Sequence, residues 1–507
     1  MILSRPSQST LALAAVTLSS LMFGLEISSV PVILPTLERT LGADFIQLQW
    51  VMNAYTVAVA SVLMAAGAVA DRFGRKRVFL IGTAAFGLTS LACGLTDNIA
   101  VLIGARFFQG VAGGVMLICQ VAILSHQFRE PKARSVAYAW WGVIFGFGLG
   151  FGPLIGSGII AVVGWEWVFL VHAALALPTI ALGFVGVQES KDPKASRLDI
   201  AGILTLSIAV LALTAFITEA PRLGLVSAPS LVILFVSIVS FVAFVMVERR
   251  VAYPMFDFGV FRVPFFSAAL VGAVGMNISF WPLIIYLPIW FHAGLGLSSI
   301  AVGVALLAYT LPTLVVPPLA ERLSLRFGSG LVIPGGLFAI GGGLLMMRLS
   351  LELSGAGWPL LAPGLVLAGV GLGLTNTTVT NTATGVVSGD RAGMASGLDM
   401  SARMITLAIN IAVMGAILFN GVLAHLTTAS QSMNLRDGAV LHQVAERVSA
   451  GSLNTGIAAD LAQQALGVGF GWITLYGGLG CWLLALGSRA LFSAASRQSS
   501  ARVQART

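Results

Sequence analysis

The chain contains a succession of apolar segments, each long enough to cross a lipid bilayer. A helix needs roughly 20 apolar residues to cross about 30 Å of hydrocarbon. In lipid, backbone polar groups need hydrogen-bond partners within the protein. A segment that crosses the bilayer outside a closed β-barrel is therefore helical. About fourteen such segments can be drawn, near 10–35, 49–70, 78–97, 99–124, 135–163, 166–187, 200–219, 229–248, 264–291, 298–319, 330–349, 358–385, 395–424 and 466–489. We therefore expect an all-α integral membrane protein.

The composition excludes a soluble globular domain. Hydrophobic residues make up 57% of the chain and charged residues only 9%, whereas soluble domains carry roughly 25% charged residues. The first apolar segment is too long for a signal-peptide core and is expected to be retained. Cys93, Cys119 and Cys481 are isolated within predicted helices, so neither disulfides nor a metal site is expected.

The basic residues predict the orientation of the chain. With an even number of crossings, most of them fall on one side, in the short connections near 72–77, 129–134, 191–197, 249–262 and 322–326 and in the C-terminal tail. The opposite side receives only Arg39, Arg222, Arg348, Arg436 and Arg447. Cytoplasmic loops are enriched in Lys and Arg, so both termini are expected in the cytoplasm of a bacterial-type cell, with the protein in its inner membrane. The same distribution explains the net charge of +8 without a nucleic-acid partner.

The connection between the second and third segments carries a compact charged motif formed by Gly67, Asp71, Arg72, Gly74 and Arg75. It resembles the loop motif between the second and third helices of the major facilitator superfamily of secondary transporters. The resemblance implies that Asp71, Arg72 and Arg75 make charge and helix-end contacts at the cytoplasmic face, stabilising an outward-open state. The alternative is a basic loop that only sets the topology.

A weak internal sequence repeat indicates two related halves. Residues 320–328 follow an apolar segment much as residues 70–74 do, and parallel repeats are common in this transporter class. We predict a six-helix bundle over 1–187, a linker with two inserted helices over 188–263, and a second six-helix bundle over 264–507. This arrangement resembles the fourteen-helix drug:proton antiporter branch of the superfamily. The longest outer connection, 426–465, includes an amphipathic stretch, and an ordinary solvated loop is favoured there over a lid.

The fourth segment contains Leu102, Arg106, Gln109 and Gly110 in a spacing that resembles another motif of the superfamily. An arginine within the membrane is costly and usually faces a cavity or a carboxylate. The resemblance implies that Arg106 takes part in proton transfer. The alternative is that Arg106 binds backbone carbonyls and holds helices together.

The fifth segment is rich in glycine, which lets membrane helices approach closely. Gly148, Gly152, Pro153 and Gly156 resemble the antiporter motif of the superfamily, with Ser157 in place of its last glycine. The resemblance implies a seam along which helices rock during export. Close packing alone is compatible with this interpretation.

Glu26 is a carboxyl group only roughly 6 Å along the helix from the midpoint of the first segment. Proton coupling needs a membrane-embedded acid of this kind. The surrounding sequence resembles the first-helix motif of the fourteen-helix branch, with Glu26 at its Asp position, Ser28 at its Thr position and Pro35 at its final Pro; Pro31 replaces its Asn. The alternative is that Glu26 only pairs with a neighbour such as Arg106.

Asp399 and Arg403 lie four residues apart in the thirteenth segment, on one face of a helix. We favour an internal ion pair and keep Asp399 as an alternative second proton or cation site. His172 and His292 lie in or beside apolar segments, and packing is favoured over proton relay as the role of both.

A substrate pocket is predicted from Glu26 together with aromatic side chains, because a carboxylate and aromatic faces suit lipophilic cations. The candidate aromatic residues are Trp140, Trp141, Trp281, Tyr286 and Tyr309. The resulting hypothesis is proton-coupled efflux of lipophilic, cationic drugs or toxic compounds by alternating access, by a protein expected to be monomeric.

Three other functions can be compared with this hypothesis. A narrow-substrate metabolite uptake carrier of the same fold and a non-transporting membrane sensor both stay open. An enzyme is not expected, because the sequence contains no P-loop, zinc-helix pattern or nucleophile elbow. No cofactor is expected, and the coupling ion is expected to be H⁺.

Overall fold

A computed structural model describes residues 7–191, 199–251, 258–352, 357–385, 392–433, 438–453 and 455–504. Over these residues the chain forms helices and turns and no strand. Within these described ranges, thirteen helices are long and apolar enough to cross a membrane, or fourteen when the bent pair Ser299–Val315 and Pro317–Phe327 counts as one span. The predicted all-α membrane fold is confirmed. The chain divides into two compact units, Met1–Met255 and Phe256–Thr507.

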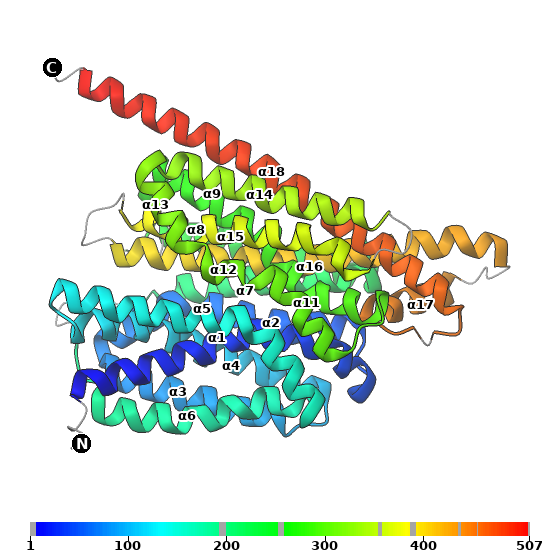
Figure 1. The fold of residues 1–507 in the computed structure, drawn as a ribbon, viewed down its shortest axis with the longest axis horizontal. Helices are drawn as coiled ribbons and strands as arrows, with labels where there is room; N and C mark the ends of the chain where they lie inside the picture. Colours follow the sequence, from blue (N-terminus) through cyan, green and yellow to red (C-terminus); the bar gives the residue numbers. More distant parts are fainter. Residues whose placement is uncertain are drawn as a thin grey trace. The chain divides into compact units, whose positions relative to one another are not determined.

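The first unit contains eight helices over its described residues (Figure 1). They are α1 (Gln8–Leu41), α2 (Phe45–Phe73), α3 (Arg75–Gly94), α4 (Ile99–Gln127), α5 (Pro131–Val162), α6 (Glu166–Gly186), α7 (Ile200–Leu223) and α8 (Ala228–Glu248). Helix α1 packs against α5 and α6, α2 packs against α4, and α3 packs against α4 and α6. Helix α7 packs against α8 and α2, so the two predicted inserted helices fall within the first compact unit.

Local sequence signals set the ends of the first two helices. The Ser7 side chain accepts a hydrogen bond from the backbone N–H of Thr10 at 3.2 Å and so caps α1. Helix α1 stops at Gly42, whose φ of 62° is left-handed. Asp44 and Gln47 then form a reciprocal capping box at the start of α2. A short turn therefore returns the chain directly into the second crossing.

The second unit contains the remaining helices. They are a 3₁₀ turn η1 (Phe258–Arg262), α9 (Pro264–Ile278), α10 (Phe280–Ile289), a π-helical turn η2 (Trp290–Gly294), α11 (Ser299–Thr310), α12 (Pro312–Val315), α13 (Pro317–Phe327), α14 (Ser329–Ser350), α15 (Trp358–Gly385), α16 (Ala392–Met433), α17 (Gly438–Ala450) and α18 (Ala459–Gln504). Helix α14 packs against α15 and α18, and α18 also packs against α9 and α16.

Several predicted segments differ in detail from the observed helices. The ninth segment breaks at Ser279, and the tenth bends by 46° between Val315 and Pro317. Proline lacks a backbone N–H and clashes with the preceding turn, which explains the bend. The connection 426–465 is largely helical over its described residues, because α16 continues into it and α17 follows. The sequence predicted a solvated loop with an amphipathic stretch, and helix accounts for more of the described part of this connection than expected.

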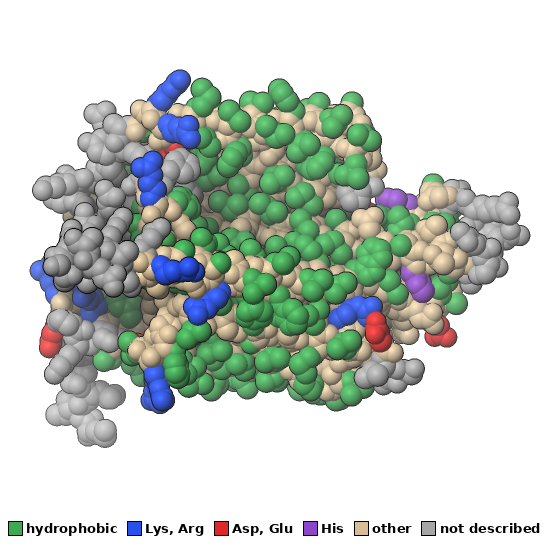
Figure 2. Space-filling model, turned by 90° about the horizontal axis from the view of Figure 1, so that it is seen from above, with side chains coloured by type: hydrophobic (Ala, Val, Ile, Leu, Met, Phe, Trp, Pro, Cys, Tyr) green, Lys and Arg blue, Asp and Glu red, His purple; other side chains and the backbone are tan. Residues whose placement is uncertain are grey.

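Many large hydrophobic side chains lie exposed on the outer surface of the described helices. Figure 2 shows hydrophobic side chains over most of the described part of one face. Only 17% of the most apolar window of α8 is buried within the protein, compared with 78% for α2. Exposed residues of α8 include Val232, Phe235, Ile238, Val239, Phe241, Val242 and Met246. Such a surface is stable in lipid and would be unstable in water.

Candidate functional site

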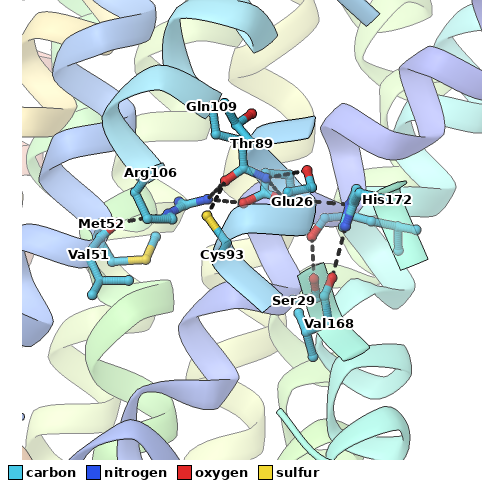
Figure 3. A network of polar contacts seen from close by, with 12 residues as sticks. Glu26, Ser29, Val51, Met52, Thr89, Cys93, Arg106, Gln109, Val168 and His172 are labelled. Atoms are coloured by element: carbon cyan, nitrogen blue, oxygen red, sulfur yellow. Dashed lines mark hydrogen bonds and ion pairs between the residues drawn. The ribbon is translucent and has the colours of Figure 1, made fainter. Parts of the chain in front are cut away.

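Glu26 lies inside the first unit with no exposed surface. Its Oε1 atom accepts a hydrogen bond from Nη1 of Arg106, which is equally buried. Its Oε2 atom accepts from Nε2 of Gln109 at 3.1 Å. Arg106 Nη1 also donates to Oε1 of Gln109 at 2.7 Å. Figure 3 shows Glu26 between these two residues of α4 and His172 of α6. A buried carboxylate is therefore paired and hydrogen bonded, as such a group must be.

Arg106 is held by further contacts from α2. Its Nε donates to the carbonyl of Val51 at 3.0 Å, and its guanidinium carbon lies 4.4 Å from the centre of the Tyr55 ring. Arg106 thus binds a backbone carbonyl, as the structural alternative expected, and also a carboxylate. A part for Arg106 in proton transfer stays a prediction. Its Nη2 and the Tyr55 hydroxyl are buried without a hydrogen-bond partner among the described residues.

The same network reaches α3 through Gln109. Its Nε2 donates to Oγ of Ser90 at 2.8 Å, and Cys93 Sγ lies 3.7 Å from its Oε1. Gln109 therefore bridges Glu26 and Arg106 and links both to a third helix.

His172 belongs to this cluster, although the sequence favoured a packing role for it over proton relay. Its Nε2 lies 3.6 Å from Oε2 of Glu26 and 3.1 Å from the carbonyl oxygen of Met22. Its Nδ1 lies 2.9 Å from the carbonyl oxygen of Val168. The favoured interpretation of His172 as a packing residue leaves these polar contacts out. The only sequence signal was an ionisable residue within a membrane segment.

The residues of the predicted antiporter motif lie on α5 and face α1. These residues are Gly148, Gly152, Pro153 and Gly156. Oγ of Ser28 donates to the carbonyl of Gly148 at 3.0 Å. A Cβ atom at Gly156 would lie 2.9 Å from Cβ of Ser29, and one at Gly152 would collide with Oγ of Ser28. The glycines therefore permit a close α1–α5 contact two and three residues beyond Glu26.

The charged loop motif lies between α2 and α3. Nη2 of Arg75 lies 2.8 Å from Oδ1 of Asp71, an ion pair one helical turn apart. Arg72 is exposed, and Gly67 lies on α2 beside Ile118 of α4. Gly74 has a φ of 113°, a backbone conformation that residues other than glycine rarely adopt. The motif therefore forms a tight turn with an internal ion pair.

Glu189, which the sequence did not single out, completes this turn. Its Oε1 accepts from the backbone N–H of Lys76 at 3.1 Å and its Oε2 from that of Arg77 at 3.3 Å. A Cβ atom at Gly74 would lie 2.6 Å from Oε1 of Glu189. A carboxylate here satisfies free N–H groups at the start of α3 and interacts favourably with the helix dipole.

A second buried ion pair lies in the second unit. Nε of Arg403 donates to Oδ1 of Asp399 at 2.9 Å, as the sequence predicted. Nη2 of Arg403 donates to Oγ1 of Thr380 at 3.0 Å, and Nη1 donates to Oδ1 of Asn376. The Thr380 hydroxyl in turn donates to Oδ2 of Asp399 at 3.0 Å. The pair thus joins α15 to α16.

Residues 16–409 match the family described as Major Facilitator Superfamily. The chain belongs to this superfamily. It is therefore a transporter rather than an enzyme. Its curated relatives include the multidrug resistance protein Stp of Mycobacterium tuberculosis, which is 33% identical over 80% of this chain and 75% of the relative. The tetracenomycin C resistance and export protein of Streptomyces glaucescens is 30% identical over 81% of this chain and 76% of the relative. These relatives are consistent with the fourteen-helix drug:proton antiporter branch.

Solved structures of the superfamily share the fold. Tetrameric PepTSo2 superposes with a TM-score of 0.61 at 16% identity, covering 97% of this chain and 100% of that structure. The nucleoside transporter NupG superposes with a TM-score of 0.59 at 13% identity, covering 95% and 100%. At these identities the likeness concerns the fold alone.

The aromatic residues predicted to line a substrate pocket together with Glu26 lie in both units. On α5, Trp140 is 55% exposed, whereas Nε1 of Trp141 donates to Oε1 of Gln120 at 2.8 Å. In the second unit, Trp281 is partly buried. The hydroxyls of the other two are used within that unit: Tyr286 donates to the carbonyl of Ile411 and Tyr309 to that of Phe280. A common pocket with Glu26 stays a prediction.

Proposed function

We propose that the chain exports lipophilic, cationic drugs or other toxic compounds in exchange for protons, by alternating access. The observation that carries the proposal is the completely buried carboxyl group of Glu26, paired with Arg106. Buried, paired ionisable residues within a membrane segment mark proton and ion pathways. The relatives named for multidrug resistance and for antibiotic export support the direction of transport and the class of substrate.

In the proposed mechanism, a proton binds Glu26 and neutralises its carboxylate. The ionic attraction between α1 and α4 then weakens, because Arg106 loses its charged partner. Helix α1 also forms the seam with α5 through Ser28 and Ser29, close to Glu26 along the helix. Protonation of Glu26 thereby affects the contact between α1 and α5 that the antiporter motif forms. Return of the proton to the cytoplasm restores the ion pair and resets the transporter.

The proposed orientation places both termini in the cytoplasm of a bacterial cell and the protein in the inner membrane. The loop that holds the Asp71–Arg75 ion pair then faces the cytoplasm. In this position the loop stabilises the outward-open state, as in the superfamily. The turn between α1 and α2 faces the outside.

The test uses purified protein in liposomes with an imposed proton gradient and ethidium as the substrate. The wild type should move ethidium against its concentration gradient, in the direction opposite to proton flow. Glu26→Gln should lose this movement, while Glu321→Gln, at an exposed position of α13, should keep it. Ethidium binding by the wild type without gradient-dependent movement would favour a sensor. Movement in the same direction as the protons would favour an uptake carrier.

A further inference from the structure

His172 is completely buried and lies against α1 at the level of Glu26. Each of its ring nitrogens faces a backbone carbonyl oxygen, which can only accept a hydrogen bond. Nδ1 lies 2.9 Å from the carbonyl of Val168, and Nε2 lies 3.1 Å from that of Met22 and 3.6 Å from the Glu26 carboxylate. Figure 3 shows the imidazole directed at these oxygens.

This geometry matters because a neutral imidazole has one N–H donor and one lone pair, whereas imidazolium has two donors. A neutral ring would direct a lone pair at one of the two carbonyl oxygens. An imidazolium donates to both and also faces the carboxylate of Glu26. The surroundings of His172 therefore match the protonated ring better than the neutral ring.

The other charged and titratable groups around His172 come from the helices packed near it. Helix α1 provides Glu26, and α4 provides Arg106, which reaches the same carboxylate. Helix α3 provides Cys93, and α2 provides Tyr55, both next to the Gln109–Arg106 part of the cluster. The membrane part of α5, residues 139–162, contains no titratable residue. Glu26 is thus the negative group shared by Arg106 and His172.

We propose that His172 is a second proton-carrying residue, which holds the coupling proton and exchanges it with Glu26. This proposal rests on the proposed proton-coupled export. In the exchange, the N–H bond at Nε2 of His172 breaks and an O–H bond forms at Oε2 of Glu26. The products are a neutral imidazole and a neutral carboxylic acid, so the total charge of the cluster is unchanged. Arg106 then loses its anionic partner without any ion entering or leaving the buried site.

The first experiment compares two kinds of ethidium movement in liposomes for His172→Gln, with His126→Gln as the control. A glutamine can still donate to one carbonyl but cannot carry a proton. Export against the ethidium gradient should fall roughly 100-fold, the scale of lost proton transfer, while movement down the ethidium gradient stays near the wild-type rate. Unchanged export at every pH would overturn the proposal. Equal loss of both movements would also overturn it, because His172 would then be structural.

The second experiment does not depend on transport or on the His172 variant. The chain has five histidines, so replacing His126, His292, His425 and His442 with Gln leaves a single imidazole for ¹⁵N NMR. Both ring nitrogens should carry a proton at pH 7 when Glu26 is present, and one of them should lose it in Glu26→Gln. A neutral ring with Glu26 intact would refute the inference. If the wild type fails to export at all, the proposed function fails, and the NMR result still decides whether Glu26 and His172 share a proton.

Discussion

Arg106 donates from Nη1 to Oε1 of Glu26, and both side chains of this ion pair are completely buried. The pair joins α4 to α1 at the centre of a buried polar cluster in the first unit. Breaking a buried pair leaves one charge without compensation, which typically costs roughly 3–5 kcal/mol. Removing both charges avoids that penalty.

A double-mutant cycle should therefore show strong coupling between the two residues. Arg106→Gln should lower the free energy of unfolding by roughly 3–5 kcal/mol. The double variant Glu26→Gln, Arg106→Gln should be destabilised by clearly less than the sum of the single variants. Unfolding in a detergent series measures each value. Additive effects would show that the pair contributes nothing beyond its separate contacts.

Arg106→Lys should impair export although it keeps the positive charge. A lysine has one ammonium group and cannot bind Glu26, Gln109 and the Val51 carbonyl in the fork geometry of a guanidinium. We expect at least a roughly tenfold loss of gradient-driven export, about 1.4 kcal/mol. Arg348→Lys is the matched control, because its ion pair with Glu352 is partly exposed. Wild-type export by Arg106→Lys would mean that charge alone suffices.

The α1–α5 seam should be sensitive to one added methyl group. Gly152→Ala places Cβ onto Oγ of Ser28, and overpacking of this kind typically costs roughly 1–3 kcal/mol. Gly158→Ala on the same helix meets nothing within 4 Å and should be neutral. Ser28→Ala should restore part of the loss in Gly152→Ala. Thermal unfolding of the wild type, the two glycine variants and the double variant Ser28→Ala, Gly152→Ala checks this. Equal stability of the two glycine variants would contradict a close contact.

Glu189→Gln should loosen the start of α3. The glutamine keeps one acceptor oxygen but loses the negative charge at the helix N-terminus, an effect worth roughly 0.3–1 kcal/mol. Amide hydrogen exchange of Lys76 and Arg77 should therefore become faster. Glu130→Gln is the control, because Glu130 precedes α5 without a side-chain capping bond. Unchanged exchange in Glu189→Gln would show that the cap contributes little.

Asp399→Asn should lower the thermal stability of the protein and leave the coupling of export to protons unchanged. The carboxylate accepts from Arg403 and from Thr380, so its loss leaves a buried guanidinium without its counter-charge. We expect a lower melting temperature and an unchanged pH profile of export, as a structural ion pair requires. A pH profile shifted like that of Glu26→Gln would instead make Asp399 the second proton site.

The spans, the family and several of the motif contacts could be read from the sequence because each depends on local spacing. Apolar runs of membrane length predict helices wherever they occur, and Asp399 and Arg403 meet because four residues make about one helical turn. The broken tenth span and the helical 426–465 connection were harder, since hydropathy alone does not show where a helix bends or continues.

The sequence by itself determined that Glu26 and Arg106 are costly residues within membrane helices, which must find polar partners there. Only the tertiary structure decided which partners they have. Glu26 on α1 meets Gln109 from α4 and His172 from α6, and Arg106 on α4 meets the Val51 carbonyl from α2. Glu189 reaches Lys76 from beyond α6. Helical periodicity fixes the face on which a side chain lies, but the neighbour it meets depends on how helices pack. The paired site at Glu26 is therefore a property of the folded bundle.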